Sequence, residues 1–472
     1  MRLLVVGGGI TGLAAAWEAV RGADGREPAD VLLAEASDRL GGKLDTEVAG
    51  DLLIEHGPDS FVGYRPAALA LAGEVGLADD VVGTSGSRLV FLRSRGRLRP
   101  LPSGMGMVLP TRLGPFVTTG ILSPADKVRA GLDLVVPRRL REGQDVAIGA
   151  FLRARLGGGI VRRFADPMVG GIYGASVDEL SLDAVLPSLR ADEEAHRSLM
   201  LAALAAGRKA RAGTRGPGSP FRTLRGGLGS LVDAVAVGLR DAGADLRLRT
   251  PVAELRPHGA GVEAVLGDGS VERLDAVVLA GGVASSSVLL AGPAPAAAAA
   301  LSKVPLATSV VVTLAYDADA FPGSVESHGW LEAEPAPISG VTVSSAKWAG
   351  RAPDGTVLIR AFVPERVGPI VHAPDAVLVE RVAGHLGAVL GVRTPPALSR
   401  VARWTAVMPK YTVGHLDRVA AVERGLEHLP AWRVAGSALR GVGIPDCIGD
   451  GRRQAGLALG ARAAGWHPVA GG

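Results

Sequence analysis

The sequence predicts an α/β plus α+β protein with a discontinuous Rossmann-like domain, an antiparallel-sheet domain and an inserted helical domain. Two observations predict the Rossmann-like domain. A short apolar strand, a glycine turn and a proline-free helix open the chain, and residues 275–282 resemble a buried parallel strand that would return to the same sheet. The third observation is length, because 472 residues exceed one compact core and divide into two or three domains.

The first unit is a strand expected at residues 3–6, followed by a tight turn and a helix. Three glycines have the G-x-G-x-x-G spacing: Gly7, Gly9 and Gly12. The first permits the turn, the second lets the backbone approach a pyrophosphate, and the third lets helix and strand pack closely. A second strand at residues 30–34 ends at Glu35, where an acid would accept hydrogen bonds from ribose hydroxyls. Together these features predict a bound dinucleotide.

The region after residue 50 alternates helical patterns with irregular apolar chain. Helices are expected at residues 65–75 and 123–136. Residues 101–121 carry one charge among prolines and glycines, and they form either the apolar lip of a pocket, a shallow membrane contact or a buried irregular segment. Residues 206–225 hold six basic residues and no acid, and we favour a solvated connector over a nucleic-acid surface because they contain one aromatic residue.

The second half of the chain supplies another helix and most of the remaining strands. Residues 229–242 are amphipathic and predict a helix. A separate antiparallel sheet is expected at residues 304–316 and 355–363. Residues 401–472 are expected to add a strand, a turn and a closing helix at 454–464. Further strands are expected at 245–248, 262–266 and 275–282.

Composition disfavours several classes of protein and site. The single cysteine, Cys447, excludes an intramolecular disulfide and cysteine-based metal sites, and the nine histidines show no ligand-like pairing, so we expect no metal. The net charge of +4 is mild for this length, and we expect no nucleic-acid partner. Glycines, serines and prolines interrupt the uncharged residues 276–302, so we expect a cytoplasmic protein without an integral membrane segment.

Several further motifs resemble the protoporphyrinogen/coproporphyrinogen oxidase family, FAD-dependent flavoproteins similar to amine oxidases. The resemblance is strongest to the soluble bacterial branch of coproporphyrinogen III oxidases. The motifs span nearly the whole chain and follow the family order, the last two being the most specific. They are RLGGK (39–43), EHGPDSF (55–61), GGIYG (170–174) with DELSL (178–182), FRTLRGGL (221–228), MPKYTVGHL (408–416) and GVGIPDC (441–447).

The resemblance implies FAD-dependent six-electron oxidation of coproporphyrinogen III to coproporphyrin III in haem biosynthesis, with O2 as acceptor and H2O2 released. The implied partners are the porphyrinogen, O2 and, transiently, a ferrochelatase. Protoporphyrinogen IX oxidation is the alternative, followed by the reaction of another FAD amine oxidase or desaturase. A nucleotide-binding module without activity is a further alternative, which a purified protein without a yellow chromophore would favour.

The resemblance names no certain catalytic residue, because the flavin carries the chemistry and the family has no agreed general base. It places the following residues at FAD: Gly7, Gly8, Gly9, Ile10, Thr11, Gly12, Glu35, Ala36, Arg39, Gly42, Lys43, Gly57, Pro58, Asp59, Ser60, Val252, Trp404, Gly443, Ile444 and Pro445.

Substrate contacts are expected from arginines, because guanidinium groups pair with the propionate carboxylates of a porphyrinogen. The candidates are Arg65 and Arg88, with a solvated side chain as the alternative for each. Pocket-wall candidates, with core packing as the alternative, are Tyr173, Met105 and Met107. Structural roles are expected for His196, His385, His415 and Cys447.

The resemblance also predicts how the chain divides into domains. The FAD-binding domain is expected at residues 1–56, 221–290 and 406–472. The substrate domain is expected at residues 57–97 and 291–405. A helical domain is expected at 98–207, followed by a connector at 208–220.

Overall fold

The computed structural model describes residues 1–22, 27–86, 90–141, 143–212 and 219–460. The chain forms two compact units, each assembled from separated segments. Unit 1 comprises residues 1–83, 219–304 and 417–460. Unit 2 comprises the described part of residues 84–218 and residues 305–416. Both units therefore draw on distant parts of the sequence.

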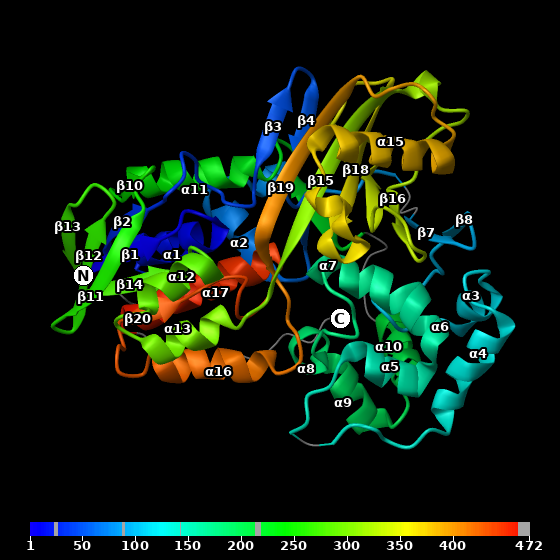
Figure 1. Cartoon of the computed structure of the whole chain (residues 1–472), viewed down its shortest axis with the longest axis horizontal. Helices are drawn as coiled ribbons and strands as arrows, with labels where there is room; N and C mark the ends of the chain where they lie inside the picture. The colour runs from blue at the N-terminus through cyan, green and yellow to red at the C-terminus, as the bar shows by residue number, and fades with distance from the viewer. Residues whose placement is uncertain (23–26, 87–89, 142, 213–218, 461–472) are drawn as a thin grey trace. The chain divides into compact units, whose positions relative to one another are not determined.

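A five-stranded parallel sheet forms the centre of unit 1, in the order β10-β2-β1-β14-β20 (Figure 1). β1 and β14 are apolar, and their inner residues are buried, as is typical of strands covered on both faces. The strands come from three distant parts of the chain, which confirms the discontinuous Rossmann-like domain. They are β1 (Arg2–Val6), β2 (Asp30–Ala34), β10 (Asp245–Arg247), β14 (Ala276–Leu279) and β20 (Trp432–Val434).

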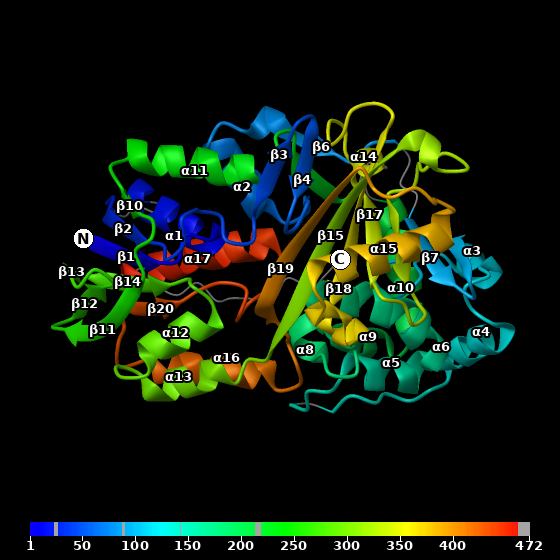
Figure 2. The same ribbon diagram turned by 45° about the horizontal axis from the view of Figure 1, so that its top comes forward.

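Helices from both ends of the chain pack on this sheet. α1 (Ile10–Arg21) lies beside α17 (Ile444–Ala458) in both views and also packs against α11 (Gly229–Asp241) (Figures 1 and 2). The side chains of Leu13 and Ile448 are fully buried in one apolar core together with the inner residues of β1 and β14. The first and last parts of the described chain therefore meet in one hydrophobic core.

The other elements of unit 1 are short. α2 (Pro66–Glu74) packs against α17. β3 (Thr46–Ala49) and β4 (Leu52–Glu55) pair as an antiparallel hairpin. The remaining elements are two three-stranded sheets and several helices: β5 (Phe61–Val62), β9 (Phe221–Leu224) and β6 (Val81–Gly83); β11 (Val252–His258), β12 (Gly261–Leu266) and β13 (Val271–Leu274); η1 (Ala78–Asp80), α12 (Val283–Leu290), α13 (Pro295–Ser302) and α16 (His415–Gly425), of which residues 417–425 belong to this unit.

Unit 2 contains a seven-stranded sheet in the order β19-β15-β18-β17-β16-β7-β8. Every neighbouring pair is antiparallel except β16 with β7, which is parallel. α15 (Asp375–Leu390) buries three leucine and valine side chains in one apolar core with β15 and β18. The strands are β7 (Val90–Ser94), β8 (Arg97–Pro100), β15 (Leu306–Asp317), β16 (Gly329–Glu332), β17 (Gly340–Val343), β18 (Thr356–Pro364) and β19 (Leu398–Pro409).

The helical region of unit 2 has a separate apolar core. Its segment η3 (Val161–Gly170) is π-helical and contains Pro167, whose missing N–H removes an ordinary helical hydrogen bond. The helices of the unit are α3 (Leu113–Thr118), α4 (Pro124–Gly131), η2 (Leu132–Leu134), α5 (Ile148–Leu156), α6 (Gly158–Ile160), α7 (Gly171–Tyr173), α8 (Leu182–Val185), α9 (Pro187–His196), α10 (Leu199–Ala212), η4 (Ala318–Ala320), α14 (Ser344–Lys347), η5 (Glu365–Val367) and η6 (Pro369–His372).

Two expectations need correction. The closing helix begins at Ile444 rather than at residue 454, because Gly443 is its N-cap and the fixed φ of Pro445 suits a first turn. Its expected last residues, 461–464, lie outside the described residues. Part of the expected connector, residues 208–212, is the end of α10. The antiparallel pairing expected of residues 304–316 and 355–363 is confirmed by β15 with β18, and one further pair of the same sheet, β16 with β7, is parallel.

Apart from the connector, the expected domain segments stay a prediction. Their boundaries at 56, 290 and 405 differ from the unit boundaries at 83, 304 and 416, and the helical region and the seven-stranded sheet share unit 2. Of residues 101–121, Phe116 and Ile121 are buried in the helical core, whereas Val117 is exposed. Within the described part of the chain, no helix is both long and apolar enough to span a bilayer.

Candidate functional site

The glycine turn of unit 1 is fixed by close backbone packing at two of its three glycines. Gly7 has a φ of 102°, and its N–H donates to the Ala34 carbonyl at 2.8 Å. A Cβ at Gly7 would lie 2.8 Å from the Cα of Gly281 on the adjacent chain, and a Cβ at Gly12 would overlap the Gly7 carbonyl oxygen. These two glycines are therefore required by the protein itself.

Gly9 is different, because a Cβ there would meet only the Cα of Gly42, at 4.0 Å. Gly9 is the N-cap of α1 and provides no side-chain cap, so the amides of Ile10 and Thr11 start a helix without a capping group. Uncapped amides at a helix start, approached by backbone without side chains, fit a pyrophosphate. The described residues thus fit a dinucleotide cofactor at this turn.

Glu35 follows β2 and orders the chain around the turn. Its carboxylate accepts from the Gly8 N–H at 2.6 Å and from the Ser37 N–H at 2.8 Å. The N–H of Thr250 donates to the Glu35 carbonyl at 2.8 Å, which brings the start of β11, with Val252, towards the end of β2. The expected contacts of Glu35, Ala36 and Val252 with the ribose and adenine stay predictions.

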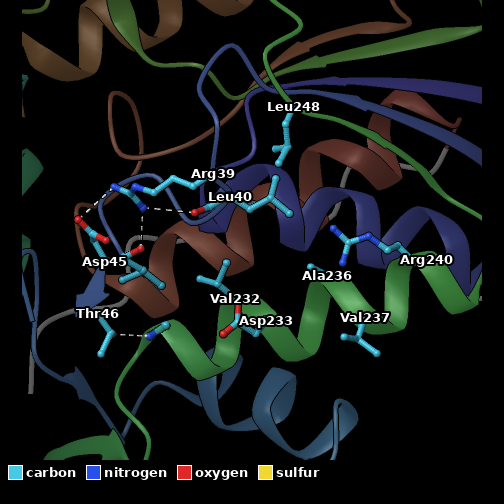
Figure 3. Close-up of a pocket in the computed structure, with 12 residues that line it drawn as sticks. Arg39, Leu40, Asp45, Thr46, Val232, Asp233, Ala236, Val237, Arg240 and Leu248 are labelled. Carbon is cyan, nitrogen blue, oxygen red and sulfur yellow. Dashed lines mark hydrogen bonds and ion pairs between the residues drawn. The ribbon is translucent and has the colours of Figure 1, made fainter. Parts of the chain in front are cut away.

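Arg39 closes the loop that follows. Its guanidinium donates to the Gly42 carbonyl at 2.7 Å and to the Leu44 carbonyl at 3.3 Å, and it pairs with Asp45 at 3.4 Å. This loop and α11 line a pocket of about 360 Å³ with the Arg39 contacts at one end (Figure 3). A Cβ at Gly42 would lie 3.1 Å from the Gly9 Cα, so the loop reaches the glycine turn.

The first turn of α17 lies beside the first turn of α1. The Cys447 thiol donates to the Gly441 carbonyl at 3.8 Å, and Thr11 and Lys43 both lie close enough to affect its ionisation. Burial raises the pKa of Cys447 to about 12 and lowers the pKa of Lys43 below its usual value. Cys447 is 7 % exposed, so the thiol is buried and neutral, in agreement with the expected structural role.

The expected flavin loop and the start of α17 both belong to unit 1. Gly57, Pro58, Asp59 and Ser60 connect β4 to β5, and the Ser60 hydroxyl donates to Asp59 at 2.7 Å. Gly443, Ile444 and Pro445 form the N-cap and first residues of α17. Arg65, expected at the substrate, is the N-cap residue of α2, and its guanidinium pairs with Asp446.

Four of the expected cofactor and pocket residues belong to unit 2, and a fifth is outside the described residues. Trp404 on β19 and Tyr173 at the end of α7 belong to unit 2, whose position relative to unit 1 is not determined. Tyr173 contacts Tyr411, with ring centroids 5.6 Å apart. Arg88 lies outside the described residues. Met105 packs against the helical core, whereas Met107 is 40 % exposed.

The histidines have structural surroundings. His415 is buried and stacks on Tyr411 with centroids 3.9 Å apart, and His385 bonds to Glu332 at 2.7 Å. His196 is exposed at the end of α9. Among the described residues no cluster of three histidine, cysteine or acidic side chains could hold a metal ion.

Sequence reasoning missed two buried acids that organise unit 1. Glu55 accepts from the Thr46 hydroxyl and from the Leu228 N–H, both at 2.7 Å, and so joins β4 to the start of α11. Asp450 on α17 accepts from the Gly436 N–H at 2.8 Å and fixes the loop after β20. The signal for Glu55 was present, because it opens one family motif and its partner Leu228 ends another.

A family model for flavin containing amine oxidoreductases matches residues 10–459. The chain belongs to this family. The cofactor of this flavin-containing oxidoreductase is FAD, and the uncapped helix start beside Gly9 fits the FAD pyrophosphate.

Individual relatives are similar over nearly the full length. Coproporphyrinogen III oxidase of Propionibacterium freudenreichii subsp. freudenreichii is 56 % identical, over 96 % of this chain and 90 % of the relative. Coproporphyrinogen III oxidase of Staphylococcus aureus (strain NCTC 8325 / PS 47) is 32 % identical, over 95 % and 97 %. The crystal structure of a putative protoporphyrinogen oxidase from Exiguobacterium sp. 255-15 superposes with a TM-score of 0.83 at 31 % identity, over 96 % and 97 %.

Proposed function

We propose that this flavin-containing oxidoreductase oxidises coproporphyrinogen III to coproporphyrin III, with O2 as electron acceptor and H2O2 as second product. The observation that carries the proposal is the 56 % identity, over 96 % of the chain, to a coproporphyrinogen III oxidase. The two most specific motifs, residues 408–416 and 441–447, also support it.

Bound FAD would supply the redox chemistry, since it accepts two electrons at a time and passes them to O2, so the six-electron oxidation takes about three cycles. The protein contributes binding and electrostatics. The first-turn amides of α1 would bind the pyrophosphate, and Glu35 would bind the ribose hydroxyls. The first-turn amides of α17 would face the flavin pyrimidine, where they favour the negative charge that develops on reduction.

The substrate requires an apolar pocket with a cationic edge, because a porphyrinogen is an apolar macrocycle rimmed by carboxylates. Tyr173 supports an apolar wall in unit 2, where it packs on the buried ring of Tyr411. Arg88 stays a candidate for the cationic edge. Trp404, half-buried on β19, stays a candidate for packing on the flavin.

Protoporphyrinogen IX oxidation is the second candidate, and the similarity to the Exiguobacterium protein favours it. The two substrates differ at the rim, since coproporphyrinogen III carries four propionates and protoporphyrinogen IX carries two. A site with more cationic groups at its edge would therefore prefer coproporphyrinogen. The main proposal includes a cytoplasmic location and a transient contact with a ferrochelatase.

The test is aerobic turnover of both porphyrinogens by the purified yellow protein, followed by porphyrin fluorescence. We expect a higher kcat/KM for coproporphyrinogen III, and a higher value for protoporphyrinogen IX would select the second candidate. Protein from which FAD has been removed is the matched control for spontaneous oxidation. Turnover of neither substrate by protein that retains FAD would contradict both candidates.

A further inference from the structure

An ion pair within unit 1 joins the starts of two helices that are far apart in sequence. Arg65 is the N-cap residue of α2, and Asp446 is the third residue of α17. The guanidinium of Arg65 donates to the Asp446 carboxylate. The side chains are 24 % and 19 % exposed, so the pair is largely shielded from solvent.

Asp446 is held tightly at the first turn of α17. Its carboxylate accepts from the backbone N–H of Gly443, the N-cap residue, and a Cβ at Gly441 would lie 2.8 Å from a carboxylate oxygen. Burial raises the pKa of Asp446, and the charge of Arg65 opposes that rise. The acid therefore carries a partly desolvated negative charge that Arg65 compensates.

This turn is close to the start of α1, where the FAD pyrophosphate would bind. Thr11, in the first turn of α1, lies beside Cys447, the residue after Asp446. One turn further, the backbone of Gly451 is so close to Thr11 that a Cβ at Gly451 would overlap the Thr11 carbonyl oxygen. The starts of α1 and α17 therefore converge, so the charge of Asp446 lies near the helix start at which a dinucleotide would bind.

We propose that Arg65 acts on the cofactor, by neutralising Asp446 beside the flavin end of FAD so that the first turn of α17 favours reduced flavin. The inference rests on the proposed function only in placing FAD at the starts of α1 and α17. Helix dipoles at a first turn stabilise a nearby negative charge, whereas an uncompensated carboxylate in the same turn repels it. Arg65 is thus a positioning residue for the redox step, and a direct substrate contact is not required of it.

The two roles of Arg65 predict different results. If Arg65 bound a propionate, Arg65→Ala would raise KM for porphyrinogen more than it lowered kcat. If it neutralises Asp446, Arg65→Ala lowers the midpoint potential of bound FAD, because reduced anionic flavin then lies near an unpaired carboxylate. Asp446→Asn removes that carboxylate and raises the potential, and the double variant returns towards the wild-type value.

The experiment is a redox titration of bound FAD in the holoenzyme against a reference dye, without porphyrinogen, so that it does not depend on substrate identity. In Arg65→Ala we expect the affinity for reduced relative to oxidised FAD to fall by about tenfold, the scale of a charge at a partly buried helix start. Arg65→Lys is the control and keeps most of the wild-type potential.

An unchanged potential in Arg65→Ala together with a raised KM would overturn the proposal. If Arg65→Ala does not retain FAD, the midpoint potential of FAD in Asp446→Asn tests the proposal alone. A potential equal to or below that of the wild type would contradict the inference. A protein with the predicted shifts that oxidises neither porphyrinogen would contradict the proposed function and leave this inference intact.

Discussion

The three glycines of the glycine turn are required for different reasons. Gly7 and Gly12 are required by neighbouring backbone atoms, whereas space remains open above Gly9. The spacing predicted these three positions, because the turn and its cofactor impose a local pattern. The pairing of Arg65 with Asp446 was not predictable, since the residues are 381 positions apart and no local pattern links them.

Substituting these glycines should separate cofactor binding from folding. Gly9 has a φ of −68°, which alanine adopts without strain, so Gly9→Ala leaves the stability of the apoprotein nearly unchanged. We expect it to weaken FAD binding by about tenfold or more, because the methyl group occupies the approach of the pyrophosphate. Fluorescence titration of apoprotein with FAD measures the loss.

Gly12→Ala is the matched comparison, and it should destabilise the apoprotein by about 1–3 kcal/mol in urea unfolding, because the methyl group overlaps the Gly7 carbonyl. Equal FAD affinity in Gly9→Ala and wild type would refute the placement of the pyrophosphate.

Cys447 should be unreactive in the folded protein. Burial raises its pKa to about 12, so the thiolate required for alkylation is scarce at pH 8. We expect iodoacetamide to leave the native holoenzyme unmodified and to label this single cysteine fully after unfolding, as measured by mass spectrometry. Rapid labelling of native protein would show that the start of α17 opens readily.

At the scale of elements, one carboxylate connects three helices of unit 1. Glu74 ends α2 and accepts from Trp17 of α1 at 2.9 Å and from Arg452 of α17 at 3.0 Å, while Arg21 pairs with it at 2.7 Å. The sequence predicted α1 and α2 and placed the start of α17 too late, and it did not predict this junction. Patterns of apolar residues specify which face is buried, and they do not specify which polar groups meet at the edges.

Glu74→Gln should lower the free energy of unfolding at pH 7 by about 1–2 kcal/mol, the scale of hydrogen bonds to a charged group. Burial alone would raise the pKa of Glu74, but the hydrogen bonds from Arg452 and Trp17 and the nearby arginine charges outweigh it and lower the pKa. The stabilisation is therefore present above the unfolded pKa of about 4.3 and disappears as the pH falls through the lower folded pKa.

Urea unfolding from pH 7 to pH 3 measures this dependence. Glu380→Gln is the control, because Glu380 is exposed on α15 and no ion pair of it occurs within the described ranges. A Glu74→Gln effect that stays constant over this range would contradict the electrostatic account.

At the scale of the molecule, the sequence predicted the parallel sheet from three separate segments, because its strands are apolar runs beside glycine turns. It predicted β15 and β18 of the second sheet and their antiparallel pairing, but it did not place β7, β8, β16 and β17, which include the parallel pair β16–β7. The part of the candidate site that the glycine motif encodes, the turn at residues 7–12, was predictable from the sequence. Trp404 and Tyr173 could be proposed only by resemblance, because their strand and helix belong to the other unit.

The central claim is that FAD bound by this chain oxidises coproporphyrinogen III. The most direct test mixes holoenzyme with coproporphyrinogen III without O2, follows the flavin band near ~450 nm, and then admits O2 and counts products. We predict bleaching of the band on mixing and, after O2, about three H2O2 per coproporphyrin III formed, because each cycle carries two electrons. A flavin band that coproporphyrinogen leaves unchanged, or porphyrin formed without peroxide, would contradict the claim.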